Sequence, residues 1–170
     1  DLMTQVRGAA MLSDIKDGDR ILISEGCTHH RQCGDIGTVK LPAWVKKFSG
    51  ADMQIDFTSG GEFPTDLSPY KLIIHCGACM LNETEMASRL ARAKEQGVPI
   101  CNYGVAIAHC NGILRRSLEL FPEALAVLDG NGMSDLAFLI AGDLHLAVVG
   151  KDEFDIRGIG YRLDTAEFFL

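Results

Sequence analysis

Short apolar runs bounded by turn residues recur along the first hundred positions of the chain. Four of these runs are rich in isoleucine, leucine or valine, which is typical of strands that are covered on both faces of a sheet. We therefore expect four strands, at Arg20–Ser24, Met53–Phe57, Lys71–Ile74 and Val98–Cys101.

Helical signals fill the segment between the third and fourth runs. Asn82 is a capping residue, Glu85 follows three positions later as in a capping box, and Gly97 supplies a stop. The apolar residues between them fall on one helical face. The pattern predicts an amphipathic helix that crosses from one strand to the next.

A second helix is expected from Val105 to Phe121, with Gly112 as a weak point inside it and Pro122 as its end. A shorter helix is predicted to start near Pro42. Strands that alternate with helices favour an α/β fold, with a mostly parallel sheet and helices on both faces.

The length of 170 residues and the 47% hydrophobic content fit one well-cored domain. We place that domain at residues 17–128. Residues 1–16 are expected to be a lead-in segment from a missing preceding domain, because the chain begins at Asp1. Residues 129–170 are set apart as a C-terminal extension of unknown role, with a hairpin expected at Gly142-Asp143.

The net charge of −7 provides no basic field for nucleic acid or anionic lipid. The longest apolar run, Leu136 to Gly150, is interrupted and falls short of the roughly 20 residues of a membrane helix. No signal peptide precedes the first strand. We expect a cytoplasmic protein with neither nucleic acid nor membrane among its partners.

Two clusters of metal-ligating residue types follow predicted strands. The stretch "EGCTHHRQC" comes after the first strand and "HCGAC" after the third. Ligands of α/β proteins collect beyond the carboxyl ends of the strands, so both clusters are expected on one rim. The candidates are Cys27, His29, His30, Cys33, His75, Cys76 and Cys79.

These residue types leave three chemistries open. A Cys-x-x-Cys between strand and helix is also the arrangement of a thiol-disulfide oxidoreductase, here with Cys76 and Cys79. Cysteine and histidine are natural zinc ligands in an interaction module. The second cluster, with Cys27 and His29, favours a metal over the redox reading, but spacing does not separate zinc from an iron–sulfur cluster. Cys101 and Cys110 are expected to be core residues.

The combined motif resembles the iron–sulfur motif of HydF, the maturation scaffold of FeFe-hydrogenase. The surrounding sequences "ILISEGCTHHRQCGDIGTVKLPAW", "FPTDLSPYKLIIHCGACMLNETEM", "GVPICNYGVAIA" and "GILRRSLELFP" are similar too, over roughly Asp17 to Pro122. The resemblance implies a non-enzymatic, cluster-binding domain with a 4Fe-4S centre. It also implies that the domain carries a two-iron precursor with CO and cyanide ligands.

The resemblance also assigns residues and partners. The three thiolate ligands are Cys27, Cys76 and Cys79, and the two motif histidines are His29 and His75. The fourth iron position would be labile and open to His29, Cys33 or solvent. The implied partners are the FeFe-hydrogenase apoprotein, the radical-SAM maturases and a second copy through a missing dimerisation domain. GTP hydrolysis would belong to another missing domain.

Overall fold

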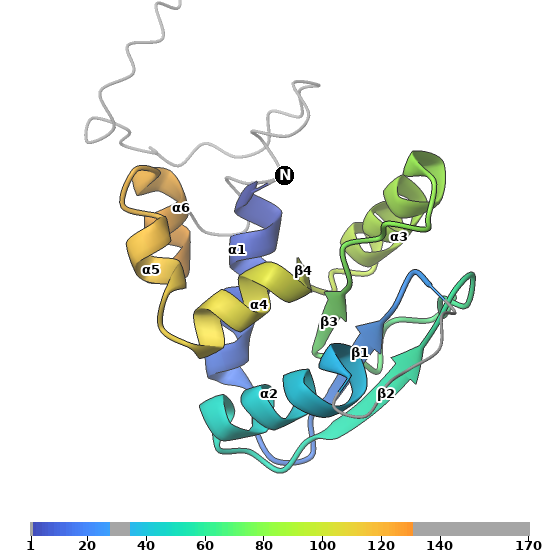
Figure 1. Cartoon of the computed structure of the whole chain (residues 1–170), viewed down its shortest axis with the longest axis horizontal. Coiled ribbons are helices and arrows are strands. Elements are labelled where there is room, and N and C mark those ends of the chain that lie inside the picture. Colours follow the sequence, from blue (N-terminus) through green and yellow to red (C-terminus); the bar gives the residue numbers. More distant parts are fainter. Residues whose placement is uncertain (1, 28–34, 131–170) are drawn as a thin grey trace, which may run out of the picture. The chain divides into compact units, whose positions relative to one another are not determined.

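The computed structural model describes residues 2–27 and 35–130. Its centre is a sheet of four strands in the order β2-β1-β3-β4, paired in parallel throughout (Figure 1). The expected α/β fold with a parallel sheet is therefore confirmed. The candidates His29, His30 and Cys33, and the expected hairpin at Gly142-Asp143, lie outside the described residues.

The strands lie close to their predicted positions, and helices or turns separate them. The strands are β1 (Arg20–Ser24), β2 (Gln54–Thr58), β3 (Leu72–His75) and β4 (Ile100–Asn102). The helices are α1 (Leu2–Ala10), α2 (Leu41–Ser49), α3 (Glu83–Glu95), α4 (Tyr103–Cys110), α5 (Leu114–Ser117) and α6 (Pro122–Leu128). Two further turns are the 3-10 turn η1 (Met11–Asp14) and the π-helical turn η2 (Ile36–Lys40).

Helices cover both faces of the sheet because successive side chains of a strand point to opposite faces. Ile21 and Ile23 of β1 pack in a core with residues of α2 and α4, whereas Leu22 between them packs in a second core with Ala93 of α3. β3 alternates in the same way. The near-continuous apolar composition of these strands follows from this double covering.

α1 packs in a third core with α5 and α6, and it also lies against the edge strand β4. A methyl group on Gly8 would meet the carbonyl group of Ile100, and its distance to Cys101 Cβ would be 2.9 Å. Glycine therefore allows this close approach of helix and strand. The segment that the sequence analysis sets apart as a lead-in thus packs closely on the sheet and on α6.

The predicted limits of α3 are confirmed by its hydrogen bonds. Asn82 Oδ1 accepts from the Glu85 backbone N–H at 2.7 Å, which caps the first turn. At the other end Gly97 has a φ of 67°, its N–H donates to Lys94 O, and the N–H of Val98 donates to Ala93 O. This pair of bonds is a Schellman motif.

The single helix expected from Val105 to Phe121 is wrong. Gly112 has a φ of 72° and its N–H donates to His109 O, while the N–H of Ile113 donates to Ala108 O. These bonds end α4 with a second Schellman motif, so that α5 starts as a separate turn. Pro122 is the first residue of α6, where its missing N–H has no consequence.

The chain reverses its direction of strand addition between β1 and β3. β2 is added on one side of β1, whereas β3 and β4 follow on the other side. In open parallel sheets, the crevice beyond the carboxyl ends of the strands at such a switch point is where ligands bind.

Among the residues that the structure describes, no helix has the length and apolar character needed to cross a membrane.

Candidate functional site

Two cysteine-bearing segments leave the sheet side by side at the switch point. One follows β1 and carries Cys27, and the other follows β3 and carries Cys76 and Cys79. Ser24 and His75, the last residues of β1 and β3, are register partners, and the Cys76 N–H donates to Ser24 O at 2.9 Å. The Gly26 N–H donates to Cys76 Sγ at 2.9 Å. The structure therefore brings the backbone that carries Cys27 into direct contact with the Cys76 sulfur.

The loop from Cys76 to Cys79 turns sharply around the same sulfur. Ala78 has a φ of 57°, in the left-handed region that residues with a side chain rarely adopt. This conformation directs the Ala78 N–H at Cys76 Sγ, with a distance of 3.4 Å. Two backbone N–H groups thus converge on one sulfur, and such donors stabilise negative charge on it.

The three cysteines that are expected to be ligands differ in exposure. Cys76 and Cys79 are free thiols, the first part-buried and the second exposed, and Cys27 is part-buried. Within residues 2–27 and 35–130, no group of three or more His, Cys, Asp or Glu residues is spaced to hold a single metal ion.

His75 is buried, and both of its ring nitrogens have partners. Nε2 lies 3.1 Å from Arg89 Nη1, and Nδ1 lies 2.8 Å from the carbonyl oxygen of Cys76. The carbonyl oxygen accepts only, so Nδ1 carries the proton and Nε2 accepts from arginine. Burial lowers the pKa of His75, the hydrogen bond to Cys76 O offsets part of this shift, and the charge of Arg89 also lowers the pKa. The ring is therefore neutral in the physiological range.

Glu25 and Tyr103 were not candidates in the sequence analysis, yet they lie on the same rim. Glu25 is buried directly after β1, and the Tyr103 hydroxyl lies 3.5 Å from its carboxylate, at the long limit of a hydrogen bond. Burial raises the pKa of Tyr103, with further contributions from the charges of Glu25, Cys76 and Asp35. A Cβ on Gly37 would collide with this pair, so glycine there leaves room for it.

The other two described cysteines belong to the core, as expected. Cys101 is 1% exposed in the main core, and Cys110 packs against it. Burial raises the pKa of the Cys101 thiol far above its usual range and that of Cys110 to about 11. A raised pKa keeps both thiols protonated near neutral pH.

These differences predict an order of alkylation in the metal-free protein. At pH 8, and among the five cysteines that the structure describes, iodoacetamide should modify Cys79 first and Cys101 last, because reaction needs an accessible thiolate. Peptide mass spectrometry of timed samples measures the order, and denatured protein, in which all cysteines should react alike, is the control. Equal rates for Cys79 and Cys101 in the folded protein would contradict this arrangement.

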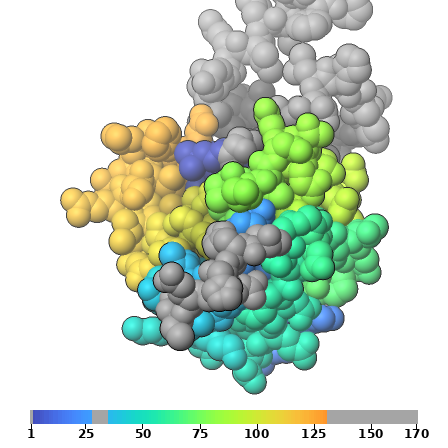
Figure 2. Space-filling model, turned by 45° about the vertical axis from the view of Figure 1, so that its right-hand side comes forward, coloured from blue at the N-terminus to red at the C-terminus, as the bar shows by residue number. Residues whose placement is uncertain are grey.

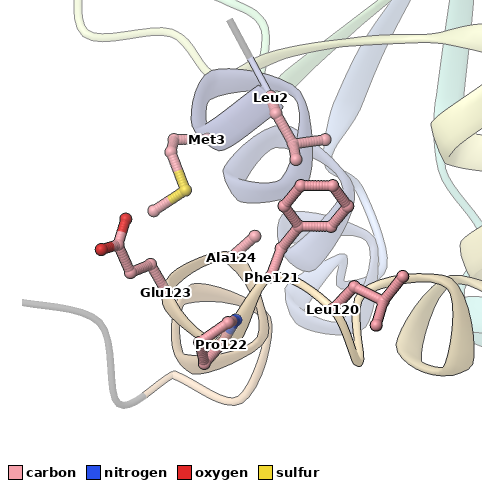
Figure 3. Close-up of a pocket in the computed structure, with 7 residues that line it drawn as sticks. All are labelled: Leu2, Met3, Leu120, Phe121, Pro122, Glu123 and Ala124. Carbon is pink, nitrogen blue, oxygen red and sulfur yellow. The ribbon is translucent and has the colours of Figure 1, made fainter.

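An apolar cavity of about 390 Å³ lies away from this rim, between the start of α1 and the start of α6 (Figure 3). It is lined by Leu2, Met3, Leu120, Phe121, Pro122, Glu123 and Ala124. Leu120 is 86% exposed and Phe121 is 52% exposed. The segment that carries them lies at the outer surface of the molecule, shown in orange in Figure 2.

Comparison with known proteins identifies the family of this chain. No match was found among the curated proteins. The family model described as the hydrogen maturase F tetramerization domain matches residues 3–120, from within α1 to the end of α5 and beyond. This stretch contains β1, β3 and both cysteine-bearing segments. The resemblance to HydF is therefore confirmed, and the chain belongs to the hydrogen maturase F tetramerization domain family.

Proposed function

We propose that this domain of the hydrogenase-maturation family binds a 4Fe-4S cluster through Cys27, Cys76 and Cys79. In this proposal it is a non-enzymatic scaffold that carries a two-iron precursor with CO and cyanide ligands. The observation that carries the proposal is the hydrogen bond from the Gly26 N–H to Cys76 Sγ, which joins the two cysteine-bearing segments at the switch point.

The donor set fits such a cluster. Thiolates are the usual protein ligands of iron–sulfur clusters, and Cys76 and Cys79 are free to serve. In a cluster each thiolate binds a different iron, so the spacing of ligands around a single ion is not required. When bound, a cluster held by three thiolates would supply one iron with an exchangeable ligand position. His29, Cys33 or solvent would occupy that position.

The protein's own contribution is to orient the sulfurs and to offset their charge. The N–H groups of Gly26 and Ala78 point at Cys76 Sγ and compensate part of the negative charge that several thiolates bring together. The buried Glu25 and the Tyr103 hydroxyl form the side of the rim next to them. His75 belongs to the proposed cofactor site through the hydrogen bonds of its ring to Arg89 and to Cys76 O.

Anaerobic reconstitution with iron and sulfide tests the proposal. Wild-type protein should retain about four irons and four sulfides per chain and give the EPR signal of a reduced cluster, as expected for a 4Fe-4S centre. Cys76→Ser should lose both, whereas Cys110→Ser, a matched change of a part-buried thiol, should not. Stoichiometric zinc without sulfide would replace the proposal by a zinc-stabilised module. A Cys76–Cys79 disulfide with reductase activity independent of Cys27 would replace it by an oxidoreductase.

We also propose that the chain associates with copies of itself, as the name of its family indicates. The exposed apolar side chains around the cavity at α1 and α6 support this part, since such patches commonly mark protein contacts. The hydrogenase apoprotein and the radical-SAM maturases are the further partners that we propose. The first would receive the two-iron precursor, and the second would supply it.

A further inference from the structure

A buried arginine links three strand ends beneath the proposed cluster site. Arg89 lies on α3 and its side chain is 1% exposed. Its donors reach Glu85 Oε1 (2.8 Å), His75 Nε2 (3.1 Å), Gly60 O (2.8 Å) and Ser24 Oγ (3.4 Å). These partners come from α3, from the ends of β3 and β1, and from the turn that follows β2.

The contacts explain how a charged group is tolerated in the interior. A buried charge is costly unless it is paired and its hydrogen-bonding groups are satisfied. Glu85 supplies the countercharge, and Phe63 lies against the guanidinium with its ring centroid 4.9 Å from Cζ. The planar fork of arginine suits this set of separate acceptors, which the single ammonium group of lysine would not reproduce.

The guanidinium also determines which ring nitrogen of His75 carries the proton. Arginine has donors only, so His75 Nε2 must accept, and the ring proton must reside on Nδ1. That proton then points at the carbonyl oxygen of Cys76. A chain of two hydrogen bonds therefore runs from Arg89 to the backbone of a proposed thiolate ligand. It also occupies the lone pair that His75 would need to bind iron.

We propose that Arg89 is a positioning residue of the cluster site, which acts through His75 to hold the Cys76 backbone in place. Metal-binding residues usually depend on such supporting hydrogen bonds. The inference rests on the proposed cluster function. The part that concerns the Cys76 backbone, which His75 and Arg89 hold in place, applies to the metal-free protein as well. It assigns His75 a supporting role and leaves coordination to the sulfurs.

Arg89→Met tests this role, and Arg92→Met is the matched control. Arg92 is also on α3 and lies against Phe63, but its guanidinium donates to Phe63 O and Pro64 O rather than to His75. Arg89→Met should release cluster iron to a chelator about 10–100-fold faster than wild type, the usual effect of losing a supporting partner. Arg92→Met should release it at the wild-type rate.

Two measurements on the metal-free protein separate this inference from the cluster proposal. In Arg89→Met, Cys76 should be alkylated roughly three- to tenfold faster, the factor for one lost hydrogen bond. In the same variant, nitrogen NMR of the imidazole should show that His75 is no longer purely the Nδ1–H tautomer. If wild type binds no cluster but these changes occur, the cluster proposal fails and the positioning role stands.

His75→Gln covers the case in which Arg89→Met does not fold. The amide atoms of glutamine stand at the ε position of the side chain, so its oxygen keeps an acceptor for Arg89, whereas the Nδ1–H that donates to Cys76 O is removed. Faster alkylation of Cys76 in this variant supports the inference. Wild-type alkylation rates in His75→Gln, or identical behaviour of Arg89→Met and Arg92→Met in every measurement, would overturn it.

Discussion

Gly26→Val is expected to abolish cluster retention and leave the fold in place. A Cβ at this position would lie 2.9 Å from Leu81 Cγ and 3.3 Å from Ala78 Cα, so the two loops would have to separate. The Gly26 N–H would then no longer reach Cys76 Sγ. Overpacking of this kind costs about 1–3 kcal/mol, which a domain of this size tolerates.

Iron and sulfide analysis after anaerobic reconstitution measures the effect, with circular dichroism as the check on folding. We expect the iron content to fall from about four per chain to less than about one. Gly61→Val is the control, because a Cβ there meets no atom within 4 Å. A folded Gly26→Val protein with a full cluster would show that close contact of the two loops is unnecessary.

Leu120→Glu is expected to weaken self-association strongly. The side chain is 86% exposed in the described unit, so it contributes little to the stability of one chain. If it is buried between copies, a carboxylate there should cost about 2 kcal/mol or more, which raises the dissociation constant roughly 30-fold. Light scattering during gel filtration, over a range of concentrations, measures the change in mass.

Val39→Glu is the matched control for this experiment. Val39 is a 52% exposed apolar residue of η2 and does not line the cavity at α1 and α6. Its variant should keep the wild-type mass. A wild-type mass for Leu120→Glu, or an equal loss of mass for both variants, would exclude the cavity surface as the specific contact between copies.

The local signals that the sequence carries were sufficient for the sheet and for α3. Runs of apolar residues mark strands that are covered on both faces. Asn82 caps α3 with its own side chain, and Gly97 ends it because glycine readily adopts a positive φ. The rim shared by the two cysteine-bearing segments also followed, because parallel neighbouring strands end on the same side.

The break at Gly112 and the residues around the cysteines did not follow from local signals. A glycine inside an apolar helical pattern is compatible with either a weak helix or a stop, and only the packing of α5 against α1 decides between them. Arg89 has the sequence appearance of an exposed helical residue. Its burial depends on Glu85, His75 and Gly60 meeting around it, which is a property of the tertiary structure.

The pairing of β1 with β3 has a consequence for the order of events in the cell. Cys27 precedes Cys76 by 49 positions in the chain, and their segments meet only where β3 pairs with β1. A nascent chain that has not yet completed β3 holds only Cys27, one of the three proposed ligands. Loading with iron and sulfur would then have to wait for the finished sheet, and a misassembled sheet would be left without metal.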